Sequence, residues 1–542
     1  MNRASSGERS DVKAVVYKHF KYAEYEYDRR FSYEIAFVRA NGVVDNLRNV
    51  ADIDDIVLVV PDLELDRARE NVRLPAERII GKSEFSERGY WGEKVLLIDE
   101  QAFYAPSQLI SKAIELARSA SYATWDDPDA LLASFGYVDQ SRFIVLPGEA
   151  ISPFLKGGFD GFLDSYNRLA SRKGCAKVHV THENIYLFYA NCAKFNPYPY
   201  HYAVEPTSRC NSKCIMCPFH SPDPEIAKGS VYIGDGGEDM SVETFKKIVD
   251  SVADMPWSYL PEYRQRQITA QLRGEPLLAP GFKEMCRYVK SRGLRLSFST
   301  NGNSLDEDFI DFFLHIGLDE IIVSIDPDRE SFNRIRPQLD FDRVMNNLKT
   351  LYRRRRELNL NVPVIYTKTV CLRNNASIDF INVAKRFSVT SDYVGFAYEN
   401  FDDYKTGVKM YSDFFFTIPD NKRIPCLALT DVVSIHADGS VYMCYGDIHS
   451  VIGNVHENPL VAIVVGNERR RQLISANSRG ELSSVPACMA CTSWTSQYNR
   501  VIYEGDFEVY QNPVLSYWKK KDMKPVGFAL KVLRKLKRII RG

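Results

Sequence analysis

Short apolar runs alternate with longer stretches of helical periodicity across residues 200–400. The runs that read as strands are 202–205, 267–272, 294–299, 320–325, 362–370 and 393–397, and amphipathic helices are predicted between them. Buried strands separated by helices are typical of a parallel α/β fold. Six such repeats predict a parallel sheet with its functional residues gathered at the carboxyl ends of the strands.

The first 195 residues also show an α/β pattern. Apolar runs at 55–61, 95–99 and 142–147 read as buried strands, with amphipathic helices at 106–118 and 159–170. We find no catalytic triad, metal-ligand spacing or phosphate loop there. Residues 1–195 are therefore expected to form an accessory domain, and recognition of a nucleotide or sugar and simple packing both stay open as its role.

The far end of the chain differs in charge. Of 542 residues, 45% are hydrophobic and 26% charged, which fits a globular protein of two to four domains. Net charge is zero, so no overall field indicates nucleic acid. Residues 519–542 nevertheless hold ten Lys or Arg against one Asp. We expect 511–542 to be a basic amphipathic tail that lies on an anionic membrane surface, packs on a partner or stays solvated.

Cysteine usage bears on the compartment. Eleven cysteines, seven of them in two clusters, do not read as a disulfide framework, and no secretory leader precedes them. No apolar run approaches the roughly 20 residues that span a bilayer. We expect a cytoplasmic protein, with the basic tail as the one route to peripheral contact with the inner membrane surface.

Three cysteines after the first predicted strand carry the strongest chemical signal. Cys210, Cys214 and Cys217 are spaced Cys-x3-Cys-x2-Cys. Iron–sulfur cubes usually take four thiolates, so three would leave one iron open to an exogenous ligand. A zinc site completed by His220 is the alternative.

Polar motifs end the next three predicted strands: Arg273-Gly-Glu-Pro276, Ser299-Thr-Asn-Gly302 and Ser324-Ile-Asp326. Together with the cysteine loop they resemble the radical SAM superfamily. The resemblance implies a partial (β/α)6 barrel over residues 200–400 and a 4Fe-4S cluster on the three cysteines. It also implies S-adenosylmethionine (SAM) bound by Gly274, Glu275, Pro276, Ser299, Asn301, Ser324, Asp326 and Arg336. Arg273 departs from the family, which has glycine there, and this puts the close approach at position 273 in doubt.

A second set of cysteines follows the barrel. Cys426, Cys444, Cys488 and Cys491 are spaced Cys-x17-Cys-x43-Cys-x2-Cys, enough thiolates to fill every corner of another cluster, with a zinc ribbon as the alternative. An Asp-Gly turn at Gly439 predicts a hairpin that brings the first two together. Residues 420–505 resemble the SPASM extension of radical SAM proteins. With no cysteine after position 491, the set is more similar to the shortened twitch form with one 4Fe-4S cluster, and its spacing is similar to that of 2-deoxy-scyllo-inosamine dehydrogenase.

The resemblance implies reductive cleavage of SAM and hydrogen-atom abstraction by the 5′-deoxyadenosyl radical, with a reductase such as flavodoxin or ferredoxin as electron donor. We expect two-electron oxidation of a carbohydrate-like or small alcohol substrate, with the second cluster accepting an electron. Glu399, Tyr398 and Lys368 are candidate proton acceptors, and Cys371 is a candidate hydrogen-atom donor. The alternatives are a peptide-modifying maturase, a radical epimerase that needs Cys371, and a non-enzyme iron–sulfur redox sensor or binding protein.

Overall fold

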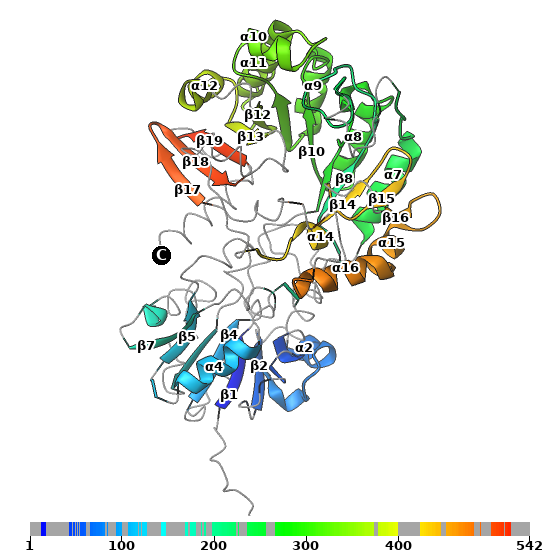
Figure 1. Cartoon of the computed structure of the whole chain (residues 1–542). Helices are drawn as coiled ribbons and strands as arrows, with labels where there is room; N and C mark the ends of the chain where they lie inside the picture. The colour runs from blue at the N-terminus through cyan, green and yellow to red at the C-terminus, as the bar shows by residue number, and fades with distance from the viewer. Residues whose placement is uncertain are drawn as a thin grey trace, which may run out of the picture. The chain divides into compact units, whose positions relative to one another are not determined.

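The computed structural model describes residues 198–372 apart from 224–225, 227–232, 234–235 and 256–265. It also describes 378–398, 423–445, 451–481, 488, 491, 500–513 and 515–521, and in the first 197 residues mainly the elements named below. The chain divides into two compact units, residues 1–196 and, apart from 257–259, residues 197–542 (Figure 1). Within the described residues, no helix is long and apolar enough to cross a membrane.

The first unit contains a mixed seven-stranded sheet of order β3-β2-β1-β4-β6-β5-β7. Its strands are β1 Val12–Tyr17, β2 Asp55–Val60, β3 Ile79–Gly81, β4 Lys94–Asp99, β5 Tyr122–Asp126, β6 Phe143–Pro147 and β7 Cys175–His179. The helices α2 (Leu65–Asn71) and α4 (Ser107–Ala117) belong to the same unit. The three strands expected from the sequence correspond to β2, β4 and β6, and β6 runs antiparallel to β4.

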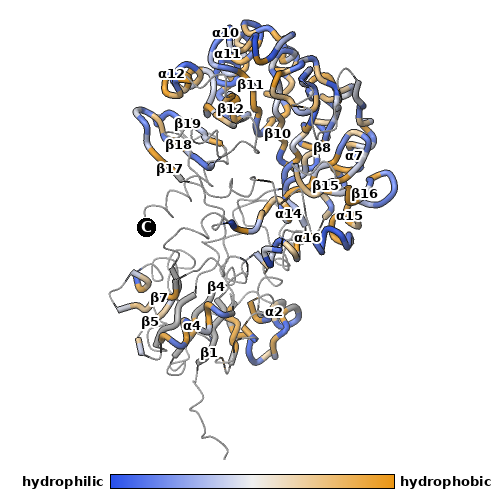
Figure 2. Tube along the Cα trace, viewed as in Figure 1, coloured by the Kyte–Doolittle hydropathy of each residue, from blue (hydrophilic) through white to orange (hydrophobic). Residues whose placement is uncertain are grey.

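The second unit is built on six parallel strands, which confirms the predicted fold class. They are β8 His201–Val204, β9 Gln267–Thr269, β10 Arg295–Thr300, β11 Glu320–Ser324, β12 Val364–Cys371 and β13 Tyr393–Tyr398. The helices between them are α7 Val242–Asp254, α8 Phe282–Ser291, α9 Glu307–Ile316, α10 Arg329–Ile335, α11 Phe341–Glu357 and α12 Phe380–Phe387. The strand segments are largely hydrophobic, whereas α11 and α12 alternate between hydrophobic and hydrophilic positions (Figure 2).

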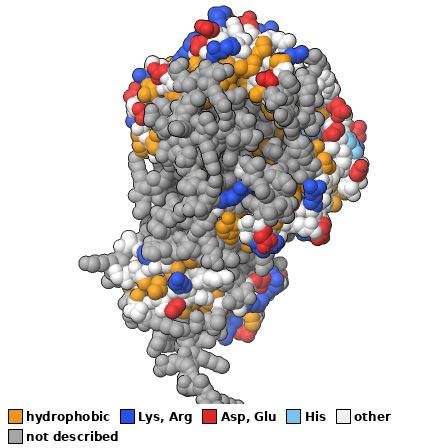
Figure 3. Space-filling view, viewed as in Figure 1, with side chains coloured by type: hydrophobic (Ala, Val, Ile, Leu, Met, Phe, Trp, Pro, Cys, Tyr) orange, Lys and Arg blue, Asp and Glu red, His pale blue; other side chains and the backbone are white. Residues whose placement is uncertain are grey.

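Alternation along each strand gives the sheet two different faces. Tyr202, Ile268 and Leu296 belong to the main hydrophobic core that the helices cover. Successive strand side chains point to opposite faces, so His201, Thr269 and Ser297 lie on the inner face of the partial barrel. Charged side chains of both signs are interspersed on the surface seen in Figure 3. On the helical layer, Arg354 of α11 pairs with Glu307 and Asp311 of α9.

Additional strands extend both edges of this sheet. On one edge β14 (Val432–Ile435) runs parallel to β8, followed by β15 (Ser440–Tyr442) and β16 (Val451–Asn454). On the other edge β19 (Leu515–Lys520) runs antiparallel to β13, beside β18 (Phe507–Asn512) and β17 (Arg500–Glu504). The helices α14, α15 and α16 span Ala428–Asp431, Leu460–Gly466 and Glu468–Ser478. The expected tail boundary at residue 511 is thus wrong, since β19 and its neighbours use residues to 521, and the basic stripe after 525 lies outside the described residues.

Candidate functional site

The cysteine loop follows β8 and is held at both ends by backbone hydrogen bonds. Ser208 N donates to Glu238 O at 2.9 Å, and Ile215 N donates to Ile335 O at 3.0 Å. Cys210 is half-buried, and burial together with the Glu275 carboxylate raises the pKa of its thiol to about 12. Within the described residues no three His, Cys, Asp or Glu side chains are close enough to hold one metal ion. The donor set itself, three thiols in one loop, fits the soft ligation of an iron–sulfur cluster.

Gly274 packs directly against the cysteine loop. A Cβ atom at this position would lie 2.3 Å from Thr207 O and 2.6 Å from Arg209 O, so only glycine fits. The next residue, Glu275, donates its backbone N–H to Arg209 O at 2.8 Å. The segments that follow β8 and β9 are therefore in direct backbone contact at Gly274 and Glu275.

The Glu275 carboxylate joins this pair of strands to the third. It accepts hydrogen bonds from Thr300 Oγ1 at 2.7 Å and from Asn301 N at 2.7 Å. Burial raises its pKa to about 7, and these two donors together with Leu277 N act in the opposite direction. Asn301 Nδ2 in turn donates to Asn211 Oδ1, inside the cysteine loop, at 2.7 Å. The motifs after β9 and β10 thus lie beside the cysteine loop, at the carboxyl ends of the strands where the sequence predicts them.

The motif after β11 reaches the loop through an ion pair. Arg336 Nε donates to Asp326 Oδ2 at 2.8 Å, and the two side chains are 5% and 0% exposed. Burial raises the pKa of Asp326 despite the opposing charge of Arg336. Against the effect of burial, the charges of Asp326 and then Cys214 raise the pKa of Arg336, which lies beside the cysteine loop. Ser299 and Ser324 complete the predicted SAM set; they are partly exposed and lie on the inner face of neighbouring strands.

Arg273, the residue that departs from the family motif, turns its side chain toward β8 and not into the motif. Its guanidinium donates to Glu205 at 2.9 Å from Nε and 2.5 Å from the terminal nitrogen. Its backbone N–H also donates to Glu205 Oε1 at 2.9 Å. Gly274 and Glu275 keep their close approach to the loop despite the larger residue.

Two of the candidate catalytic residues, Lys368 and Cys371, lie on opposite faces of β12. Lys368 lies on the inner face, opposite Ser324 in the pairing with β11, and its side chain has no partner among the described residues. Burial, then the charge of Arg336, lowers the pKa of Lys368. Cys371 lies three residues further on, faces the helices and belongs to the hydrophobic core at 2% exposure. This placement does not support the hydrogen-donor role. Tyr398 ends β13, its side chain lies outside the described set, and Glu399 is also outside it.

Cys426 lies within electrostatic range of the other three later cysteines, although, among the residues that the structure describes, no three of these side chains are close enough to hold one metal ion. The charges of Cys444, Cys491 and Cys488 add to burial in raising the pKa of Cys426 to about 12. The backbone of Cys426 is held by the Asn477 amide of α16, through bonds of 3.2 and 3.1 Å. The predicted hairpin is confirmed: β14 and β15 pair antiparallel around Gly439, whose φ is +82°.

Strand direction places these cysteines at the opposite end of the sheet from the first loop. Cys426 precedes β14, which runs parallel to β8, and Cys444 follows β15, which runs back. Tyr445, next to Cys444, hydrogen-bonds with His201, the first residue of β8, at 2.7 Å. The cysteine loop follows the last residue of the same strand. The two cysteine sites are thus separated by at least the length of β8, about 13 Å for four residues.

A row of neutral polar side chains crosses the inner face from β8 to β10. His201 Nε2 hydrogen-bonds with Thr269 Oγ1 at 2.7 Å, and Thr269 Oγ1 with Ser297 Oγ at 2.9 Å. Gln267 Nε2 donates to Ser297 Oγ at 2.8 Å. Burial lowers the pKa of His201 to about 4, so it is neutral at pH 7. The sequence analysis missed this row, although polar residues two apart in the apolar runs were the available signal.

Aromatic side chains occupy the other part of the inner face. Tyr366 of β12 stacks on Tyr393 of β13, with ring centroids 4.9 Å apart and planes at 15°. Tyr517 of β19 packs edge-on against Tyr366 at 5.3 Å. Its ring lies over Gly395, where a Cβ would be 2.9 Å away. The interior is thus bounded by tyrosines beside β13 and by hydroxyl groups beside β8 to β10.

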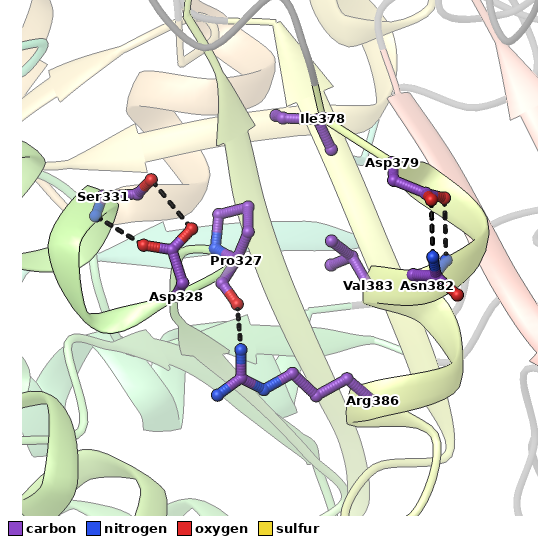
Figure 4. Close-up of a pocket in the computed structure, with 8 residues that line it drawn as sticks. All are labelled: Pro327, Asp328, Ser331, Ile378, Asp379, Asn382, Val383 and Arg386. Carbon is purple, nitrogen blue, oxygen red and sulfur yellow. Dashed lines mark hydrogen bonds between the residues drawn. The ribbon is translucent and has the colours of Figure 1, made fainter.

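A separate pocket of about 280 Å³ lies on the helical side, between the start of α10 and α12 (Figure 4). Asp328 accepts from Ser331 N at 2.8 Å, and Asp379 accepts from Asn382 N at 3.0 Å, which caps the two helices. Arg386 donates to Pro327 O at 2.7 Å. These polar groups are used within the fold, and the pocket is separate from the cysteine loop.

The fold and site define a radical SAM protein with a second cysteine centre, and the comparisons agree. Residues 204–371 match the radical SAM superfamily, and residues 426–492 match the iron–sulfur cluster-binding SPASM domain. The chain therefore contains a domain of the radical SAM superfamily, followed by an iron–sulfur cluster-binding SPASM domain. Membership implies SAM, its 4Fe-4S cluster and auxiliary iron–sulfur binding.

Individual relatives are more distant. The tungsten-containing aldehyde ferredoxin oxidoreductase cofactor-modifying protein of Pyrococcus furiosus is 33% identical over 124 residues, which is 23% of this chain and 30% of the relative. The curated relatives that the chain matches are covered over less than half of their length.

Two solved structures are similar in fold. BtrN in complex with AdoMet and 2-DOIA is 15% identical, with a TM-score of 0.34 over 56% of this chain and 96% of that one. Streptococcus suis SuiB bound to the precursor peptide SuiA is 11% identical, with a TM-score of 0.40 over 60% and 83%.

Proposed function

We propose that this enzyme oxidises a small hydroxylated, carbohydrate-like substrate bound inside the partial barrel. The observation that carries the proposal is the row His201, Thr269 and Ser297 on the inner face. These side chains are neutral and can each donate and accept hydrogen bonds, which suits the hydroxyl groups of a polyol. A site built from buried hydrogen-bonding groups discriminates strongly against analogues that lack the partner hydroxyl.

The residues that would hold the cofactors lie at the carboxyl ends of the strands. Cys210, Cys214 and Cys217 would ligate the first cluster, with SAM contacting the motifs after β9, β10 and β11. When bound, this centre would supply hydrogen-atom abstraction from an unactivated C–H bond. Cys426, Cys444, Cys488 and Cys491 would ligate a single auxiliary 4Fe-4S cluster, and their four thiols supply the ligand number for it.

Lys368 is the residue that we propose to interact with the reacting hydroxyl. It lies on the inner face opposite Ser324, and burial, then the charge of Arg336, lowers its pKa, which favours the neutral amine that can accept a proton. A half-buried lysine with a perturbed pKa and no side-chain partner among the described residues is the pattern expected of a functional group. Its position on the inner face supports a role in removing the hydroxyl proton.

The test uses the full chain, reconstituted anaerobically and reduced in the presence of SAM. Formation of 5′-deoxyadenosine is measured with a panel of deuterated polyols and amino sugars and with short peptides. The proposal expects a hydroxylated compound to stimulate formation and to transfer deuterium into the product. Stimulation by peptides alone would contradict it and favour a maturase.

A matched pair of variants tests the inner face. Thr269→Val removes a hydroxyl from the polar row, where Thr269 is half-buried, and Thr367→Val removes one from the helix-facing side of β12, where Thr367 is fully buried. We expect the first to raise the KM for the active compound about tenfold or more, because a buried partner is left unpaired. The second should leave KM unchanged. Equal effects of the two variants would argue against substrate binding at Thr269.

A further inference from the structure

Glu205 lies at a junction of three segments that are far apart in the sequence. It is the residue after β8, and its side chain is 0% exposed. One carboxylate oxygen accepts from Arg273 N and Nε at 2.9 Å each, and the other accepts from the Arg273 terminal nitrogen at 2.5 Å and from Ala437 N at 3.0 Å. Its own backbone N–H donates to Ile435 O at 2.9 Å.

Each of the three segments leads directly to a cysteine site or a cofactor motif. Glu205 is five residues before Cys210 in the first cysteine loop. Arg273 immediately precedes the Gly-Glu-Pro motif that packs on this loop. Ala437 lies in the turn between β14 and β15, inside the segment that joins Cys426 to Cys444. The ion pair is therefore shared by the SAM-binding part and the auxiliary part of the second unit.

We propose that the Glu205–Arg273 ion pair, closed by the Ala437 N–H, is a positioning device that fixes the auxiliary hairpin to the cysteine loop and so sets the spacing of the two cysteine sites. This proposal rests on the proposed role of the seven cysteines as cluster ligands, and it is independent of the substrate class. The substitution of glycine by arginine in the family motif then has a specific purpose in this chain. Glycine at position 273 could supply the backbone N–H but no guanidinium.

The geometry explains why this link is stiff. An arginine that meets a carboxylate through two nitrogens fixes both distance and orientation. The carboxylate is buried and its five hydrogen bonds come from two different segments, so movement of either segment leaves a buried charge without its partners. The β14–β15 hairpin can move away from the cysteine loop only if these hydrogen bonds break.

The test compares two double variants in the reconstituted full chain. Glu205→Gln with Arg273→Met removes both charges of the junction. Arg355→Met with Asp392→Asn is the matched control, because this pair is 4% and 3% exposed against 12% and 0% for Arg273 and Glu205, and it joins the amino ends of β12 and β13. The readouts are amide hydrogen exchange of residues 432–445 and of β11, and the magnetic interaction between the two reduced clusters in electron paramagnetic resonance.

We expect exchange in residues 432–445 to accelerate about tenfold or more in the junction variant, with β11 unchanged and the magnetic interaction altered. The control should leave residues 432–445 and the interaction as in the wild type. Unchanged exchange in the junction variant, or equal acceleration in both variants, would overturn the proposal. If the junction variant does not fold, Arg273→Lys keeps the charge but loses the two-nitrogen contact, and it should show the same local acceleration to a smaller degree.

Discussion

Replacing Gly274 by alanine tests the close contact between the Gly-Glu-Pro motif and the cysteine loop. The added Cβ would lie 2.3 Å from Thr207 O, 2.6 Å from Arg209 O and 2.7 Å from Ser208 C. These are backbone atoms, so relief needs a shift of about 1 Å in the loop itself. Overpacking of this kind costs about 1–3 kcal/mol. Separation of Arg209 O from Glu275 N, now at 2.8 Å, costs about 1 kcal/mol more.

The expected loss is therefore about 2–4 kcal/mol, concentrated at the loop that carries Cys210. The assay is iron per chain after anaerobic reconstitution, together with the thermal midpoint. Gly274→Ala should lose about four irons of about eight and unfold at lower temperature. Gly466→Ala is the control, because no atom lies within 4 Å of its Cβ position. Wild-type iron content and an unchanged midpoint for Gly274→Ala would refute the steric argument.

Three further predictions concern the remaining groups. Cys488→Ala with Cys491→Ala should reduce iron from about eight to about four per chain, and zinc in the wild type with four irons throughout would exclude the auxiliary cluster. His201, with a folded pKa of about 4 against 6.5 unfolded, contributes stability that is complete above pH 6.5 and lost as pH falls through 4. His201→Gln should reduce the difference in unfolding free energy between pH 7.5 and pH 4.5, measured by urea titration, by up to about 3 kcal/mol. The same difference in the wild type and the variant would contradict this prediction. Lys368→Met should abolish oxidised product while 5′-deoxyadenosine still forms, and unchanged product yield would exclude proton acceptance by this side chain.

The six parallel strands and their terminal motifs were predictable because local signals specify them. Each strand is an apolar run, and each motif directly follows its strand. The faces of these strands were also within reach of the sequence. Lys368 and Cys371 are three residues apart in one strand, so they must lie on opposite faces. Cys371 lies an even number of residues after the apolar Ile365, so the two side chains point to the same face of the sheet. This spacing would have assigned Cys371 to the core.

Long-range pairing could not be obtained in this way. β14 joins β8 across more than 200 residues, and nothing in either strand specifies that partner. In the segment 515–520, hydrophobic and polar residues alternate and the last two are charged, so the sequence predicts the start of a tail. Pairing with β13 makes this segment a strand. The direction of the Arg273 side chain was equally inaccessible, because it depends on a buried carboxylate 68 residues earlier in the chain.

The pairing of β14 with β8 also determines where a substrate could lie. A parallel neighbour shares the direction of β8, so the turn with Ala437 falls at the end of the sheet that holds the first cysteine loop, and Cys426 and Cys444 fall at the other. An antiparallel β14 would have brought all seven cysteines to one end and left the polar row outside them. With the observed direction, His201 and Thr269 lie between the two sites. A hydroxylated compound bound there would face the first centre on one side and the auxiliary centre on the other, as oxidation in two one-electron steps requires.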